Sequence, residues 1–194
     1  TIQPGVRVEF QSYKSFFVQG RILAEGTVSD SIVFTSVHPD TGWYGLRYVS
    51  TPLTNDTSKF KYCRIEYGKT PQTGTGDARY GGGVFIKGFG KIIFSNCLFQ
   101  HNSAGWGGAI QARDNASIVI EHSTFRNNYA QFSGAAIRLF DFSHAVVRFN
   151  RIYNNTVGSG GAGMYLYRSD AFIYNNHFYG NVSNSSGGAA SLDN

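Results

Sequence analysis

The chain has 194 residues, enough for one domain with a continuous core, and includes 24 Gly, 16 Phe and 12 Tyr. This composition favours short strands separated by tight turns and argues against a helical fold. The formal net charge of +5 permits an acidic partner, although a mildly basic solvated surface has the same charge. No run of about 18 apolar residues occurs, so the sequence predicts no membrane span.

The N-terminal part, residues 1–60, carries short apolar runs at uneven spacing. Four runs are interpreted as short strands separated by turns: residues 1–10, 17–20, 22–26 and 31–34. Farther on, Gly45 and Leu46 resemble the glycine-to-strand transitions that recur later in the chain. We therefore expect residues 1–60 to form shorter, irregular coils of a single domain that spans residues 1–194.

A polar segment, residues 69–79, separates this part from the more regular remainder. It is too long for a tight turn and predicts a protruding loop. Solenoids place functional residues in loops of this kind. The sequence leaves open whether the loop covers the neighbouring strands or points away from them.

From residue 81 onward, glycine-led turns recur at a nearly constant spacing. They begin at Gly81, Gly107, Gly134, Gly161 and Gly187. A fixed period in this range indicates a solenoid in which each repeat covers the hydrophobic face of its neighbour. Each repeat divides into three strand-like pieces without helical periodicity. Residues 81–194 therefore predict regular coils of an all-β, right-handed parallel β-helix with three short strands per coil and about 26–27 residues in each coil.

Polar residues also recur with this period. An asparagine follows the third strand of each repeat, at Asn102, Asn128, Asn155 and Asn181. Stacked asparagine amides can hydrogen-bond to one another, so these four predict a structural ladder.

Cys63 and Cys97 each precede a core residue by two positions and should share one inward position on neighbouring coils. They would form either a disulfide or a reduced pair packed as small apolar groups, and we expect no metal there.

The outward positions of the first strand in each repeat carry cations and aromatic residues. These candidate ligand-binding residues are Arg47, Phe85, Lys87, Arg113, Arg138, Phe140, Tyr165 and Tyr167. Cations form charge-assisted hydrogen bonds with carboxylate or sulfate, and aromatic rings cover the apolar side of a sugar. The stripe therefore predicts binding of an anionic polysaccharide or of a surface protein.

The run from Cys97 to Asn102 (Cys-Leu-Phe-Gln-His-Asn), followed by Gly-Gly-Ala-Ile at residues 107–110, resembles the pectate-lyase-like right-handed β-helix superfamily. It is most similar to repeats of secreted bacterial surface proteins and polymorphic outer-membrane proteins. The resemblance covers nearly the whole chain and implies an extracellular or cell-surface setting in bacteria. The superfamily includes lyases, hydrolases, epimerases, adhesins and inert spacers, so the resemblance leaves the activity open.

Two enzyme alternatives use residues of this stripe. In a polysaccharide lyase, Lys87 or Arg113 would abstract a proton, with Arg138 nearby, but lyases of this superfamily also carry a carboxylate cluster for Ca²⁺, which the preceding coil lacks. In a glycosidase, Asp114 and Asp141 would be the paired carboxylates. The hydrolase signatures of the superfamily (Asn-Thr-Asp, Asp-Asp and His-Gly) are absent, and both aspartates also suit turns.

We therefore expect a non-catalytic β-helix module that serves as a rigid stalk or adhesin, requires no cofactor and does not bind nucleic acid. Because the chain starts and stops abruptly, we expect it to belong to a larger polypeptide. A third possibility is a structural subunit of a surface or secretion assembly, with Phe85, Phe140, Tyr165 and Tyr167 as exposed contact points.

Overall fold

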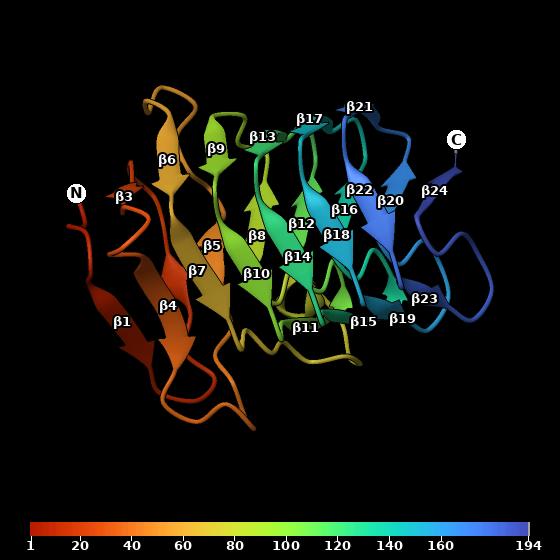
Figure 1. The fold of residues 1–194 in the computed structure, drawn as a ribbon, viewed down its shortest axis with the longest axis horizontal. Helices are drawn as coiled ribbons and strands as arrows, with labels where there is room; N and C mark the ends of the chain where they lie inside the picture. The colour runs from red at the N-terminus through yellow and green to blue at the C-terminus, as the bar shows by residue number, and fades with distance from the viewer. Residues whose placement is uncertain (194) are drawn as a thin grey trace.

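The computed structural model describes residues 1–193 as a parallel β-solenoid of about seven turns. The turns stack along one axis, with the N-terminus and the C-terminus at opposite ends (Figure 1). The described residues contain no α-helix, only a 3₁₀ turn at Asp77–Arg79, and therefore no helix long and apolar enough to cross a membrane. The predicted domain ends at Asn194, which lies outside the described residues.

Three long sheets form the walls, and all pairs of neighbouring strands are parallel. Sheet 1 contains β1 (Arg7–Phe10), β4 (Ile32–Ser36), β7 (Cys63–Glu66), β10 (Leu98–Gln100), β14 (Thr124–Arg126), β18 (Arg151–Tyr153) and β22 (His177–Tyr179). Sheet 2 contains β2 (Phe16–Phe17), β5 (Leu46–Tyr48), β8 (Val84–Lys87), β12 (Ile110–Arg113), β16 (Ile137–Phe140), β20 (Met164–Tyr167) and β24 (Ala190–Asp193). Sheet 3 contains β3 (Leu23–Glu25), β6 (Ser58–Lys61), β9 (Ile92–Ser95), β13 (Ser117–Glu121), β17 (His144–Arg148) and β21 (Asp170–Tyr174).

This arrangement confirms the predicted solenoid with three strands per coil. In the C-terminal part, Leu98 pairs with Thr124 and Thr124 with Arg151, so one coil has the same length as the repeat of the glycine-led turns. The structure adds a short fourth strand between sheets 1 and 2 in the later coils. These strands are β11 (Ser103–Trp106), β15 (Tyr129–Ser133), β19 (Thr156–Val157) and β23 (Val182–Ser183). The glycine turns follow them, and Gly107 has a φ of 65° that side chains rarely adopt.

The N-terminal coils are irregular in length: the first, from Ile2 to Ala24, is shorter than a regular coil, and the second, from Leu23 to Lys59, is longer. Val33 pairs with Arg64, and Leu46 pairs with Val84. In both cases more residues separate the two partners than in a regular coil. On sheet 1, the step from Arg7 to Val33 is as short as a regular coil. The extra residues lie in the turns between strands, where insertions leave the stacking of the strands unchanged.

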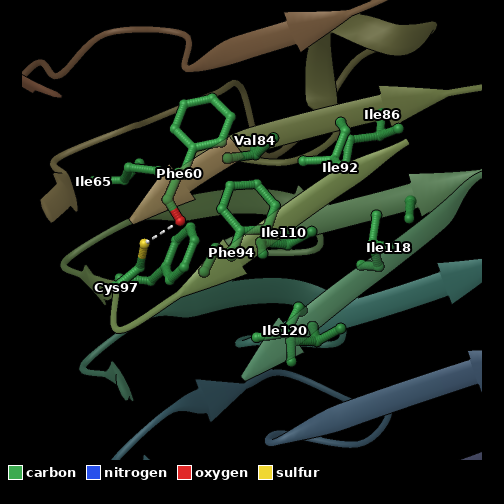
Figure 2. Packing of buried hydrophobic residues seen from close by; sticks show 14 of the residues in the cluster. Phe60, Ile65, Val84, Ile86, Ile92, Phe94, Cys97, Ile110, Ile118 and Ile120 are labelled. Atoms are coloured by element: carbon green, nitrogen blue, oxygen red, sulfur yellow. Dashed lines mark hydrogen bonds between the residues drawn. The ribbon is translucent and has the colours of Figure 1, made fainter. Parts of the chain in front are cut away.

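The core lies inside the three sheets and is filled by inward columns of apolar side chains. The Phe99 and Phe125 rings of neighbouring coils stack with their centroids 4.5 Å apart. Figure 2 shows Phe60 and Phe94 packed among isoleucines of several strands. Burying each such side chain contributes about 1.5–3 kcal/mol. This continuous packing holds the outer face of sheet 2 in register.

The four repeated asparagines lie in one column, in which Asn102, Asn128 and Asn155 are buried and Asn181 is half-buried. Asn102 donates to Asn128 at 3.1 Å, Asn128 to Asn155 at 2.9 Å, and Asn155 to Asn181 at 2.9 Å. Each acceptor oxygen also accepts a backbone N–H of the preceding asparagine. The amides therefore satisfy the backbone of the turns as well as one another.

A second polar column runs along the corner between sheets 3 and 1 and includes both cysteines. Its members are Cys63, Cys97, Ser123, Asn150 and Asn176, linked for example by Asn150 donating to Asn176 at 2.9 Å. Both cysteines are buried free thiols, and the Cys97 thiol donates to the Phe60 carbonyl at 3.4 Å (Figure 2). The pKa of the Cys63 thiol is raised, mainly by a hydrogen bond with the Cys97 thiol and secondly by burial.

Candidate functional site

The eight candidate ligand-binding residues lie on the outer side of sheet 2, in two adjacent columns. Strand register places Arg47, Phe85, Gln111, Arg138 and Tyr165 in the first column. It places Lys87, Arg113, Phe140 and Tyr167 in the second. We call these nine residues the basic-aromatic face. Their alternation with buried residues such as Ile86 and Leu139 explains why they point away from the core.

The first column is largely covered, which corrects the expectation that the whole stripe is open to solvent. Phe85 is 0% exposed, Arg47 4% and Arg138 6%. The Tyr80 ring lies against Phe85 with centroids 5.6 Å apart, and Arg47 donates to the Tyr80 carbonyl oxygen. Phe85 is therefore not an exposed contact point for a partner. Lys87, Arg113, Phe140, Tyr165 and Tyr167 are half-buried and form the accessible part of the face.

Tyr80 and the end of the 69–79 loop lie beside Arg47 and Phe85. Its middle, residues 71–76, is exposed, and the chain then turns back through the 3₁₀ turn onto sheet 2. The Asp77 carboxylate accepts a hydrogen bond from Lys87 Nζ at 2.8 Å. The Arg79 guanidinium lies 4.0 Å from the centre of the Trp106 ring. The loop thus forms one wall beside the face.

Arg113 is the centre of a small charged cluster. Its Nε donates to Asp114 at 3.0 Å, and its Nη2 lies 3.6 Å from an Asp141 oxygen. Burial alone would lower the pKa of Arg113, but the hydrogen bond and charge of Asp114 outweigh this effect and raise it. Asp114 and Asp141 have φ values of 58° and 48°, in the left-handed region that Asp tolerates in turns. Both aspartates therefore act as turn residues that bind Arg113.

Arg138 and three aromatic rings, Phe140, Tyr165 and Tyr167, form a cluster next to Arg113. Arg138 Nε donates to Ser133 at 2.8 Å, and burial lowers the pKa of Arg138 to about 10. Its guanidinium lies 4.2 Å from the centre of the Phe140 ring and 5.4 Å from that of Tyr165. Phe140 and Tyr167 stack with centroids 4.8 Å apart. Phe140 and Tyr167 of neighbouring coils thus stack on each other, and the Arg113 and Arg138 guanidinium groups lie over the Phe140 ring.

Tyr165 is tied to the last coil. Its hydroxyl donates to the Asp193 carboxylate at 2.6 Å, and burial together with this hydrogen bond raises the pKa of Tyr165 to about 12. The phenol therefore stays neutral and acts as a donor at ordinary pH.

The residues do not fit the calcium ion that the lyase alternative requires. Among residues 1–193, no three His, Cys, Asp or Glu side chains come together in a group that could hold a metal ion. Lys87 and Arg113, the candidate bases, are already bonded to Asp77 and Asp114.

Sequence reasoning missed a column of aromatic residues that borders the face. Tyr80 lies 5.3 Å from Trp106, and Trp106 stacks on Phe132 at 4.4 Å, all between ring centroids. Each of these residues comes one or two positions before a glycine-led turn, a periodic signal that was visible in the sequence. Asp77 was also missed, and it has no such signal because its loop occurs once.

Residues 53–194 match a family described as "Right handed beta helix region". The chain matches no curated protein and no solved structure. The family match covers the coils that carry Phe85, Lys87, Arg113, Arg138 and Phe140, and it describes their fold without assigning them a role.

Proposed function

Since this chain belongs to the right-handed β-helix family, we propose that it is a non-catalytic binding module that recognises an acidic polysaccharide through the basic-aromatic face. In this proposal it is a rigid part of a secreted or cell-surface bacterial protein. Family membership accounts for the scaffold, and the argument for the ligand comes from the face.

The observation that carries the proposal is the cluster of Phe140, Tyr165 and Tyr167 in contact with the Arg113 and Arg138 guanidinium groups. Aromatic faces pack against the apolar side of sugar rings, and arginine forms directed hydrogen bonds with carboxylates. Arg138 directs two of its donor atoms to Ser133 and Gln111. A guanidinium has five N–H donors, and Arg113, the half-buried arginine of the face, is the one that a ligand can reach. A polymer that alternates rings and carboxylates would match this surface.

A binding role has more support than catalysis because the charged groups are occupied by one another. A base must be within reach of the substrate proton and free to accept it. Lys87 donates to Asp77, and Arg113 bonds Asp114 and lies near Asp141. A substrate would have to displace these partners first. The solenoid also suits a stalk, because the stacked coils and the asparagine ladder run along its whole regular part.

The proposal is tested by binding to an array of acidic polysaccharides, with product analysis for every polymer that binds. Replacing Phe140 and Tyr167 together by Ala should abolish binding. The matched control replaces Tyr153 and Tyr179, a stacked pair on sheet 1 with centroids 4.6 Å apart and Arg151 over Tyr153 at 5.7 Å. The control variant should bind as the unmodified protein does. Cleavage of a bound polymer, or equal loss of binding in both double variants, would refute the proposal.

A further inference from the structure

A separate pocket of about 310 Å³ lies at the N-terminal end of the basic-aromatic face. Phe17, Val49 and Phe85 form its apolar walls, and Arg47, Tyr44 and Asp77 add polar groups. The pocket is therefore bounded by β2, β5, β8 and the 69–79 loop. Its volume is at the lower end of the range for small-molecule sites, which suits one ring and not a polymer segment.

Arg47 gives this pocket its chemistry. The side chain is 4% exposed, its Nη1 donates to the Tyr80 carbonyl, and its guanidinium lies 5.4 Å from the centre of the Phe85 ring. Burial lowers the pKa of Arg47 to about 10, which still leaves it charged at neutral pH. Among residues 1–193, no carboxylate forms an ion pair with Arg47 within 4.0 Å. A buried cation without a paired anion is unusual because its desolvation is uncompensated.

The remaining charges of the pocket do not cancel Arg47. Asp77 lines the pocket and its charge favours the protonated guanidinium, but its carboxylate already accepts from Lys87 at 2.8 Å. The two cations and one carboxylate leave an excess of positive charge. A ligand with one carboxylate would restore the balance, and its ring would contact Phe17, which is 65% exposed at the mouth of the pocket.

We propose that this pocket binds a single hexuronate unit, with the sugar carboxylate on Arg47 and the sugar ring against Phe17. The choice of a sugar acid rests on the proposed function. In that function, the hexuronate unit in the pocket would be the acidic end of the polysaccharide that binds the face. The size of the pocket, its apolar walls and the lack of a paired anion on Arg47 support it independently.

The test is a calorimetric titration of the whole chain with glucuronate, its methyl ester, glucose and acetate. Glucuronate should bind in a saturable manner, and the other three at least about tenfold more weakly, because each lacks either the charge or the ring. Arg47→Gln should weaken glucuronate binding at least about tenfold. The matched control, Arg151→Gln, changes an arginine on sheet 1 and should bind glucuronate as the unmodified protein does.

Two results would overturn the inference: no saturable glucuronate binding, or acetate or the ester binding as tightly as glucuronate. If Arg47→Gln does not fold, Phe17→Ala decides, since the exposed Phe17 ring can be removed without opening the core. An unchanged affinity in Phe17→Ala would then reject the assignment. The double replacement of Phe140 and Tyr167 separates the two proposals. If the double variant loses polymer binding and keeps glucuronate binding, both proposals are supported. If the unmodified protein binds glucuronate but no polymer, only the proposed function is refuted.

Discussion

At the scale of single residues, charge and hydrogen-bond partners decide which side chains are available to bind a ligand. Arg113, Lys87 and Arg138 lie at the outward positions expected from the sequence. Asp114, Asp77 and Ser133 accept hydrogen bonds from them. Asp114 follows Arg113 directly, so this partner was readable from the sequence. Asp77 could not be assigned to Lys87, because the path of a loop that occurs once depends on contacts that no repeat predicts.

The two buried thiols give a prediction for pH. Folding raises the pKa of Cys63 above its ordinary value of 9.0, so the folded protein keeps a proton that the unfolded chain loses above about pH 9. This contribution to stability is complete below that pH and is lost as the pH rises, at roughly 1.4 kcal/mol per unit. Urea unfolding from about pH 7 to about pH 10 should show the decline, and Cys63→Ala should flatten it. Equal slopes in both proteins would contradict this explanation.

At the scale of strands and turns, the period of the sequence was sufficient for the regular coils. The glycines and asparagines recur because each coil repeats the same turns, so the strands of the three long sheets from β10 to β22 could be placed from the sequence. The second polar column was harder to predict because its members change along the chain, from Cys97 through Ser123 to Asn150. These residues share an equivalent position at the same corner of successive coils, and the identity of each residue alone does not reveal that position.

The asparagine ladder gives a prediction at this scale. Asn128 lies in the middle of the ladder, buried, and bonds both neighbouring asparagines and the Phe99 carbonyl. Replacing Asn128 by Ala leaves several buried groups without partners and should cost at least about 2 kcal/mol in unfolding free energy. Asn181, near the end of the ladder, is partly exposed and is the matched control. Asn181→Ala should cost less than Asn128→Ala, because Asn181 makes fewer bonds and is partly exposed; urea unfolding measures both. Similar costs in the two variants would contradict a ladder that stabilises the turns through its buried interior.

At the scale of the whole molecule, the solenoid has chemically different sides. Sheet 2 carries the basic-aromatic face and its loop, while sheet 3 exposes apolar residues such as Phe172, which is 76% exposed. Outward alternation predicted which residues line the sheet 2 face. It could not predict their exposure, because the cover over Arg47 and Phe85 comes from Tyr80 and the 69–79 loop, which are distant from Arg47 in the sequence.

The central claim is that an acidic glycan lies on the outer side of sheet 2 and is not cleaved there. A crystal structure of the chain with an acidic oligosaccharide tests this most directly. We predict an intact oligosaccharide with sugar rings over Phe140 and Tyr167 and carboxylates near Arg113 and Arg138. An oligosaccharide bound instead on sheet 1 at Tyr153 and Tyr179, or one cleaved on sheet 2, would contradict the claim.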